Sequence, residues 1–196
     1  MDLSTGNQRQ GAAQGDPEME AAREAEAQLV RRAPRDPEAF AALYRRHYPA
    51  IQRYLRRRLG DPDLVEDAVA ETFVSALQQI SRYEERGLPF RSWLYMLATG
   101  QASRQRRRAA RLAQAQLEID PVSVDPISSP SVDVVRAALL RISERHQAVI
   151  ALHHLEGLSL EVVAHTLGCR VGTVKSRLAR GRDALRAQLE RMGERS

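Results

Sequence analysis

The chain has 196 residues, of which 43% are hydrophobic and 28% are charged, as in an ordinary globular protein. The formal net charge is +5. Because Lys175 is the single lysine, arginine carries nearly all of the positive charge, which suits a polyanionic partner such as nucleic acid. The alternative is that these arginines only solvate the exposed faces of helices. The lone Cys169 excludes an internal disulfide, and neither a signal peptide nor a membrane span is recognisable, so we expect a soluble cytoplasmic protein.

The N-terminal segment predicts a tail followed by a helical extension. Residues 1–17 are rich in Gly, Gln and Asp and offer almost nothing to bury, which favours disorder. Residues 18–35 contain strong helix formers, with glutamates at the start and arginines at the end, as the helix dipole prefers. We therefore expect this extension to be partly helical.

A first domain is predicted over residues 36–112, and it begins with a helix that Asp36 caps and Pro37 opens. We expect this helix to bend at Pro49 and to end at Gly60. Its apolar residues recur at helical spacing and predict one buried stripe, which consists of Phe40, Leu43, Tyr44, Ile51, Leu55 and Leu59.

Two further helices complete the predicted first domain. One opens with Asp61 and Pro62. Its predicted buried stripe consists of Leu64, Ala68, Val69, Phe73, Ala76, Leu77 and Ile80. After a polar turn, the last helix runs from Phe90 to about Arg111, with an apolar first half and a basic second half.

A linker and a second domain follow. Residues 113–130 contain several prolines and acidic residues and no basic residue, which predicts a flexible acidic linker. Residues 131–196 predict four helices, and no segment shows the alternation typical of a strand. The sequence therefore predicts an all-α protein in which a flexible acidic linker joins two small helical domains.

The last two predicted helices have the pattern of a helix-turn-helix motif. Gly157 ends one helix, Ser159 can cap the next, and Gly168 ends that helix after about three turns. A short turn then leads into a longer helix. This arrangement places the second helix of such a motif in the DNA major groove.

A helical wheel separates two faces of that longer helix. One stripe is apolar and consists of Val174, Leu178, Gly181, Leu185 and Leu189. Thr173, Lys175, Ser176, Arg180 and Arg182 lie away from this stripe, where such side chains suit contacts with base edges and phosphates. Arg177 lies beside the stripe, so a phosphate contact and an internal ion pair are both open. The alternative for the whole segment is an ordinary solvated amphipathic helix.

Residues 36–108 and 131–190 resemble the extracytoplasmic-function (ECF) sigma factors, the minimal two-domain members of the bacterial sigma family. The resemblance rests on the segments "FAALYRRHYPAIQRYLRRRLGDPDLVEDAVAETF", "FRSWLYMLA" and, most specifically, "GTVKSRLARGRDAL". It implies a first domain (sigma region 2) that binds RNA polymerase core and melts promoters, and a second (sigma region 4) that reads the minus-thirty-five element. RNA polymerase core and promoter DNA are the implied partners, and family members are commonly held by an anti-sigma factor.

The resemblance also assigns roles to individual residues. The helix at residues 61–82 would bind a coiled coil of the largest polymerase subunit. Its exposed acidic ridge consists of Asp63, Asp67 and Glu71. The alternative is that these three residues only solvate their helix or pair with local arginines. The candidates for the minus-ten element are Tyr83, Arg91, Trp93, Gln101, Arg104, Arg107 and Arg108, although core packing is the favoured role of Trp93. The candidates for the minus-thirty-five element are Arg170, Thr173, Lys175, Ser176, Arg177 and Arg180.

Several positions depart from the pattern that the resemblance implies. Family members usually carry Gln at Ala70, Glu at Val162, an Arg-Asn pair at Thr99 and Gly100, and a small capping residue at Arg170. A glycine inside a helix costs about 1 kcal/mol relative to alanine. Promoter melting is therefore less secure than polymerase binding. Two alternatives stay open: a stand-alone helix-turn-helix regulator, and a sigma-like interaction protein that no longer melts promoters.

Other chemistry is not indicated. His165 and Cys169 stand four residues apart, but a metal site needs about four ligands and no further ones are apparent. The sequence contains no Gly-rich phosphate loop and no nucleophile with a partnered base. We therefore expect no catalytic residue, no metal, no cofactor and no enzymatic activity.

Overall fold

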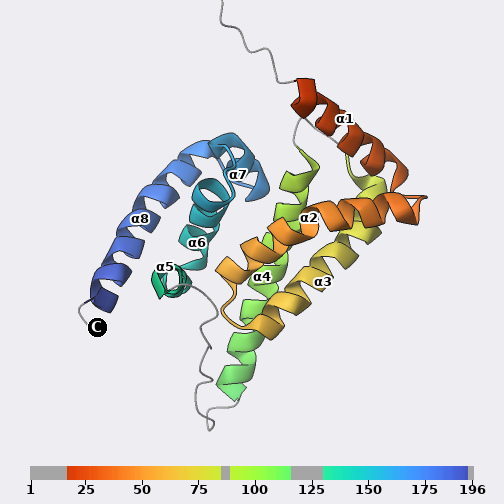
Figure 1. Ribbon diagram of the computed structural model, residues 1–196. Helices are drawn as coiled ribbons and strands as arrows, with labels where there is room; N and C mark the ends of the chain where they lie inside the picture. Colours follow the sequence, from red (N-terminus) through yellow and green to blue (C-terminus); the bar gives the residue numbers. More distant parts are fainter. Residues whose placement is uncertain (1–16, 85–88, 116–129, 194–196) are drawn as a thin grey trace, which may run out of the picture.

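The computed structural model describes residues 17–84, 89–115 and 130–193 (Figure 1). Every regular element within these ranges is a helix, which confirms the predicted all-α fold. The predicted tail, apart from Pro17, and most of the predicted linker lie outside the described residues. None of the helices in the described ranges is long and apolar enough to cross a bilayer.

Two groups of helices make up the fold, in agreement with the predicted two-domain architecture. The first group consists of α1 (Pro17–Arg32), α2 (Pro37–Arg58), α3 (Pro62–Gln79), the 3-10 helix η1 (Ile80–Arg82) and α4 (Phe90–Ala115). The second group consists of α5 (Pro130–Arg141), α6 (Glu144–Ile150), the π-helix η2 (Ala151–Leu155), α7 (Leu160–Thr166) and α8 (Val171–Gly193).

The predicted starts of α2 and α3 are confirmed. The Asp36 carboxylate accepts hydrogen bonds from the backbone N–H groups of Glu38 and Ala39, at 3.0 and 3.3 Å. Asp61 caps α3 in the same way through two backbone N–H groups, at 2.8 and 3.4 Å. In both helices a proline fills the first turn, where its missing N–H leaves no donor unpaired.

The end of α2 differs from the prediction. The helix continues through Pro49, and Leu59 with its extended backbone ends it one residue before Gly60. Gly60 does not adopt the left-handed conformation that a helix-terminating glycine uses. Its carbonyl instead accepts a hydrogen bond from Arg136 of α5 at 3.2 Å.

The core of the first group forms where α2, α3 and α4 meet. Most of the two predicted stripes are at least half-buried, but Leu77 is 53% exposed and Tyr44 is 39% exposed. Leu77 lies about 100° of helix rotation beyond the buried Ala76 and is directed away from the core. Tyr44 stays at the surface, with its ring centroid 4.6 Å from that of Phe73. The prediction of burial is wrong at Leu77 and Tyr44, because spacing alone does not show how wide the contact is.

The second group matches the predicted helix-turn-helix. Gly157 and Gly168 have φ values of 71° and 59°, as expected of glycines that end helices. The Ser159 hydroxyl accepts a hydrogen bond from the N–H of Val162 at 3.3 Å and so caps α7. Gly181 allows α8 to approach α6, because a Cβ atom there would lie 3.0 Å from Cδ1 of Ile150.

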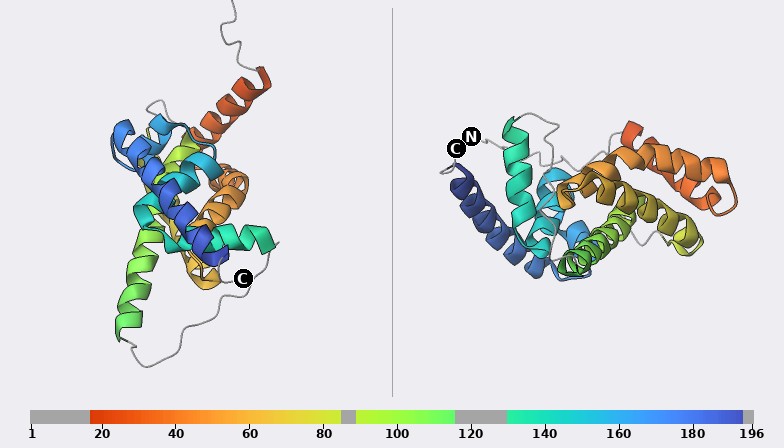
Figure 2. Two further views of the ribbon diagram at one scale, coloured as in Figure 1. Left: turned by 90° about the vertical axis from the view of Figure 1, so that its left-hand side faces the viewer. Right: turned by 90° about the horizontal axis from the view of Figure 1, so that it is seen from below.

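The two groups pack against each other, which the sequence did not indicate. α2 contacts α5, α6 and η2, while α4 contacts α7. The views in Figures 1 and 2 show the second group lying against α2 and α4, with α3 on the opposite side of the molecule. α8 lies on the outer side of its group, away from α3.

Candidate polymerase and nucleic-acid interfaces

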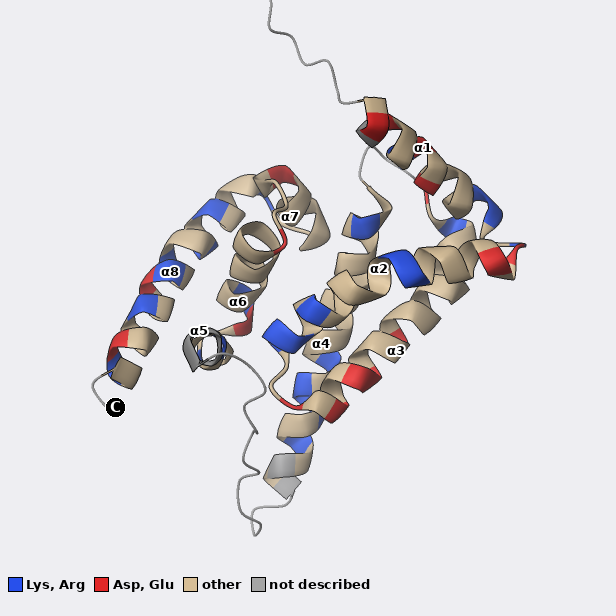
Figure 3. Cartoon of the chain, viewed as in Figure 1, with Lys and Arg blue, Asp and Glu red and all other residues tan. Residues whose placement is uncertain are grey.

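The second helix of the helix-turn-helix presents polar and basic side chains to solvent. Lys175, Ser176 and Arg180 are exposed on α8, and Arg170 is exposed immediately before the helix. Figure 3 shows basic residues spaced along α8. The buried side of the helix is the predicted apolar stripe, in which Val174, Leu178 and Gly181 are buried. The exposed face of the N-terminal half of α8 is therefore polar and basic.

Two predicted members of this set are less exposed. Thr173 is half-buried in the first turn of α8, where its N–H donates to the carbonyl of Arg170 at 2.9 Å. Arg177 is also half-buried, and its Nη1 lies 3.9 Å from the Sγ of Cys169. Arg177 thus lies between the exposed face and the core, as the helical wheel predicted.

The outer face of α3 combines acidic and apolar side chains. Asp63, Asp67 and Glu71 are exposed, and among the described residues none of their carboxylates forms an ion pair. Figure 3 shows acidic residues along this helix. Val74 and Leu77 are exposed and continue the same face at helical spacing. We refer to these five residues as the α3 face.

One face of α4 carries exposed basic side chains. We define this outer face by five residues at spacings of three and four: Trp93, Met96, Gly100, Arg104 and Arg107. Met96, Arg104 and Arg107 are exposed, and so is the neighbouring Arg108. The exposure of these arginines is compatible with phosphate contacts, and their role in binding DNA stays a prediction.

Gln101 does not belong to the outer face. It is only 4% exposed, and its amide donates to the Ser75 hydroxyl at 3.1 Å and to the Glu71 carbonyl at 3.3 Å. In this structure Gln101 therefore connects α4 to α3 and is unavailable to DNA, contrary to the prediction. The basic run that follows in the sequence gave no sign of this.

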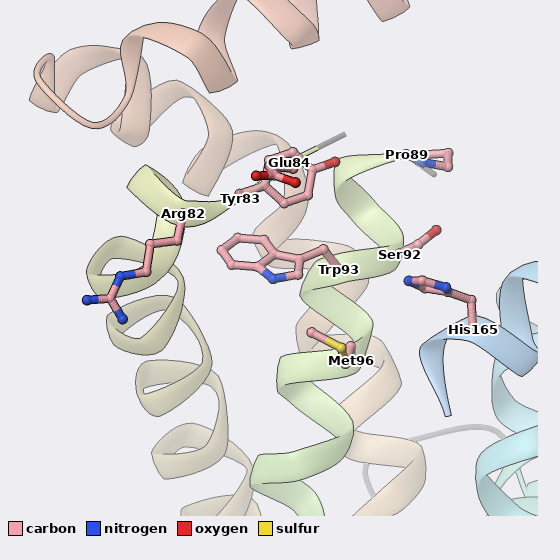
Figure 4. Close-up of a pocket in the computed structure, with 8 residues that line it drawn as sticks. All are labelled: Arg82, Tyr83, Glu84, Pro89, Ser92, Trp93, Met96 and His165. Atoms are coloured by element: carbon pink, nitrogen blue, oxygen red, sulfur yellow. The ribbon is translucent and has the colours of Figure 1, made fainter. Parts of the chain in front are cut away.

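A pocket of about 320 Å³ lies between the start of α4 and η1 (Figure 4). Trp93 and Tyr83 line it, and their ring centroids are 5.0 Å apart. Trp93 also packs 5.3 Å from Phe90, so it serves both the aromatic cluster and the pocket wall. The Ser92 hydroxyl is buried beside the pocket with no hydrogen-bond partner among the described residues. Across the pocket, His165 of α7 completes the lining.

Arg91 points away from the outer face and toward a buried carboxylate. The Glu156 side chain is fully buried, and its oxygens lie 2.5 Å from Arg57, 3.4 Å from Arg91 and 3.5 Å from Arg53. The Tyr95 hydroxyl donates to the same carboxylate at 2.6 Å. Burial, and then this hydrogen bond, raise the pKa of Tyr95 above its usual range. We call these five residues the Glu156 cluster.

A second buried network crosses between the groups of helices beside the Glu156 cluster. Arg58 is only 1% exposed, and its guanidinium donates to the Gln147 side chain and to the Tyr54 hydroxyl, each at 2.9 Å. The Tyr54 hydroxyl lies 2.7 Å from that of Thr99, and the Gln147 amide donates to the Leu139 carbonyl at 2.8 Å. We call these residues the Arg58 network.

Neither buried network was predicted from the sequence, although the position of Glu156 indicates that this residue needs partners. Glu156 directly follows a helix C-terminus, where the helix dipole disfavours a carboxylate. Such a residue therefore needs cationic or hydrogen-bonding partners from elsewhere. Its partners Arg53 and Arg91 lie 103 and 65 residues away in the chain, so local patterns could not name them.

Comparison with known proteins gives the family of the chain. The Sigma-70 region 2 family matches residues 43–112, and the Sigma-70 region 4 family matches residues 133–185. The ECF RNA polymerase sigma factor SigL of Mycobacterium tuberculosis is 35% identical over 161 residues, which cover 78% of this chain and 89% of the relative. The chain belongs to the ECF RNA polymerase sigma factor family. This sigma factor is also 29% identical to SigW of Bacillus subtilis over 170 residues, covering 79% of this chain and 90% of that relative.

Two solved structures are similar to this sigma factor. One is the sigma factor RpoE in complex with the anti-sigma factor NepR from Bartonella quintana, with a TM-score of 0.66 and 26% identity, covering 77% of this chain and 96% of that chain. The other is CnrH in complex with the cytosolic domain of CnrY, with a TM-score of 0.64 and 28% identity, covering 85% of this chain and 97% of that chain. Both support the helical architecture of this sigma factor.

The matches confirm the predicted function at the level of the family. Sigma factors are transcription initiation factors that bind RNA polymerase and direct it to promoters, and this chain carries both regions. A stand-alone helix-turn-helix regulator would not account for region 2. The matched ranges lie inside the two predicted domains, whose limits stay a prediction.

Proposed function

We propose that this sigma factor binds RNA polymerase core through the α3 face and contacts promoter DNA through α8 and the outer face of α4. The exposure of Lys175, Ser176 and Arg180 on the second helix of a helix-turn-helix is the observation that carries this assignment. Side chains at that place reach base edges and phosphates in a major groove. We assign α8 to the minus-thirty-five element.

The α3 face supports the assignment to polymerase. Its carboxylates have no cationic partner among the described residues, and Val74 and Leu77 leave apolar surface beside them. A partner with cationic and apolar side chains would satisfy both features. On a protein of net charge +5, this face is also the one that DNA would repel.

The outer face of α4 and the pocket at its start are assigned to the minus-ten element. Arg104, Arg107 and Arg108 supply exposed cations for phosphates. Trp93 and Tyr83 line a pocket in which an unpaired base could stack. Gln101 stays outside this proposal because it is buried against α3.

We further propose that the protein acts in the cytoplasm, without enzymatic activity of its own, and that an anti-sigma factor is among its partners. The solved complex of RpoE with the anti-sigma factor NepR supports the last point, because this chain is similar to RpoE over most of its length.

The test of DNA recognition is transcription with purified core polymerase on a promoter library. Arg180→Ala is expected to lower output about tenfold and to change promoter choice, because one good base contact contributes about 1–3 kcal/mol. Arg186→Ala removes the same charge from an exposed position further along α8 and is the matched control. Unchanged output and promoter choice with Arg180→Ala would contradict the assignment.

Polymerase binding is tested separately by co-migration with core polymerase in gel filtration. Asp67→Lys reverses a charge in the middle of the α3 face and is expected to weaken binding at least tenfold. Glu190→Lys makes the same change on α8 and should leave binding intact. Equal binding by both variants would show that α3 is not the polymerase surface.

A further inference from the structure

Helix α1 precedes the part of the chain that the Sigma-70 region 2 family matches, which begins at residue 43. We propose that α1 positions the pocket between Tyr83 and Trp93, in which an unpaired promoter base would stack. Glu26 of α1 is the positioning residue, because its carboxylate is connected to the pocket through His47. The effect of α1 on promoter opening rests on the proposed function, whereas its effect on the shape of the pocket does not.

One contact of α1 is apolar and reaches the pocket at Tyr83. A second cavity, of about 230 Å³, lies between the end of α1 and η1, and its lining includes Val30, Pro34, Ile80 and Tyr83. Val30 and Tyr83 both pack against the hydrophobic core. Tyr83 lines this cavity as well as the pocket that contains Trp93. Tyr83 therefore lies between α1 on one side and Trp93 on the other.

The other contact of α1 is polar and involves a buried histidine. Oε2 of Glu26 lies 3.3 Å from Nε2 of His47 and 3.1 Å from Nε of Arg46. His47 is only 5% exposed, and its Nε2 forms no hydrogen bond of regular geometry within the described residues, so its polar contact is the Glu26 carboxylate. Burial alone would raise the pKa of Glu26, but His47 and the nearby arginines together hold it below its usual value. Glu26 is therefore ionised at neutral pH.

His47 also contacts the start of α4. Its ring centroid lies 5.5 Å from that of Phe90, the first residue of α4. The ring centroid of Phe90 lies in turn 5.3 Å from those of Tyr83 and Trp93. These distances connect Glu26, through the buried rings of His47 and Phe90, to both aromatic walls of the pocket. α1 therefore supports the pocket at two places.

The two walls of the pocket come from different elements. Tyr83 follows η1, whereas Trp93 belongs to the first turn of α4 (Figure 4). Their separation is therefore decided by the packing around them and not by the geometry of one helix. A pocket that stacks a base works only while its walls are held in place within about 0.5 Å, and α1 supplies part of that packing. Because α1 lies apart from α8 in both Figures 1 and 2, a change in α1 should leave the surface of α8 intact.

Fluorescence of the free full-length chain tests the effect on the pocket, because Trp93 is the only tryptophan. Glu26→Lys places a cation beside His47 and Arg46. We expect this variant to shift the emission maximum of Trp93 to longer wavelength and to raise its quenching by acrylamide. Glu24→Lys makes the same change at an exposed position of α1 and should leave both quantities unchanged. Circular dichroism checks that each variant keeps its helices.

Val30→Ala is a second variant, which weakens the apolar contact of α1 and keeps the proposal testable should Glu26→Lys lose helicity. It is expected to change the emission and the quenching of Trp93 in the same direction as Glu26→Lys, by a smaller amount. If the folded variants keep the Trp93 fluorescence of the unchanged chain, the proposal is overturned.

Promoter opening with core polymerase tests the consequence for transcription. A promoter selected from the library is used once as a duplex and once with a mismatched, already opened minus-ten region, and permanganate reactivity of unpaired thymines measures opening. Glu26→Lys is expected to reduce opening of the duplex at least about fivefold, because the loss of one stacked base costs that factor or more. Glu24→Lys should open the duplex as the unchanged chain does. Transcription from the already opened promoter should be equal for all three chains.

Two further outcomes separate the proposal from the proposed function. A defect of Glu26→Lys that is equally large on both templates would overturn the role of α1 in opening. If the unchanged chain binds core polymerase but opens no promoter, the proposed function of the pocket fails, while the fluorescence of Trp93 still decides whether α1 positions its walls.

Discussion

The two sides of α4 use the same residue type for opposite purposes. On the side that faces the second group, Arg91 and Arg106 donate to Glu156 and to the Arg58 carbonyl. On the outer face, Arg104 and Arg107 are exposed to solvent. The difference shows that arginine content in a basic helix does not measure its contact with DNA, because some guanidinium groups are structural donors inside the protein.

The acidic residues make the same point. The carboxylates of the α3 face are exposed and have no cationic partner among the described residues, whereas the Glu156 carboxylate is fully buried among three arginines. The carboxylates of the α3 face suit a partner from outside the chain, whereas the Glu156 carboxylate connects two parts of the same chain. Burial and partners, rather than charge, separate interaction surfaces from internal contacts.

The largest expected effect lies on the inward side, at Arg58. Arg58→Ala removes a fully buried side chain and leaves the Gln147 side chain and the Tyr54 hydroxyl short of a donor. We expect the free energy of unfolding to fall by about 3 kcal/mol. Urea denaturation measures this change. Arg108→Ala on the exposed side is the control, and an equal loss for both variants would remove the distinction between the two sides.

A smaller loss is expected at Tyr95. Tyr95→Phe keeps the ring and removes the hydroxyl that donates to the buried Glu156 carboxylate at 2.6 Å. A hydrogen bond to a charged group contributes about 2 kcal/mol, and we expect a loss of that order in urea denaturation. Tyr44→Phe changes a surface hydroxyl and should cost less than about 0.5 kcal/mol. A negligible effect at Tyr95 would mean that water replaces its hydrogen bond.

Gly100 is expected to give a gain in stability. Gly100→Ala adds a side chain in open space on the outer face and removes backbone entropy from the unfolded chain, which stabilises a helix by about 0.5–1 kcal/mol. Thermal unfolding measures the gain. At Gly181 the same substitution should destabilise, because its Cβ would lie 3.1 Å from the Cβ of His146. A loss of stability at Gly100 would show that the outer face is less open than described.

The smallest effect on stability is expected for Arg104→Ala and Arg107→Ala, within about 0.5 kcal/mol. Their effect should appear in promoter binding by the polymerase complex. Each lost phosphate contact makes the slope of log affinity against log salt about 0.9 less negative. Titrations at several salt concentrations measure that slope. An unchanged slope for both variants would place the DNA elsewhere.

The local structure of this protein was readable from its sequence. Asp36 and Asp61 cap their helices, Gly157 and Gly168 end theirs, and Ser159 starts α7, each as predicted. Short-range geometry decides these features, because a cap or a left-handed glycine depends on neighbours within a few residues. The spacing of apolar residues likewise predicts which side of α8 is buried.

Only the tertiary structure decided how far each face is covered and where the polar side chains find partners. It leaves Leu77 exposed, buries Gln101 against α3, and turns Arg91 toward Glu156. Each of these outcomes depends on a neighbour from another helix, and the side-chain partners of Glu156 stand 61 to 103 residues away in the chain. Helical periodicity reports the direction of a side chain along its own helix, but it carries no information on which helix lies opposite.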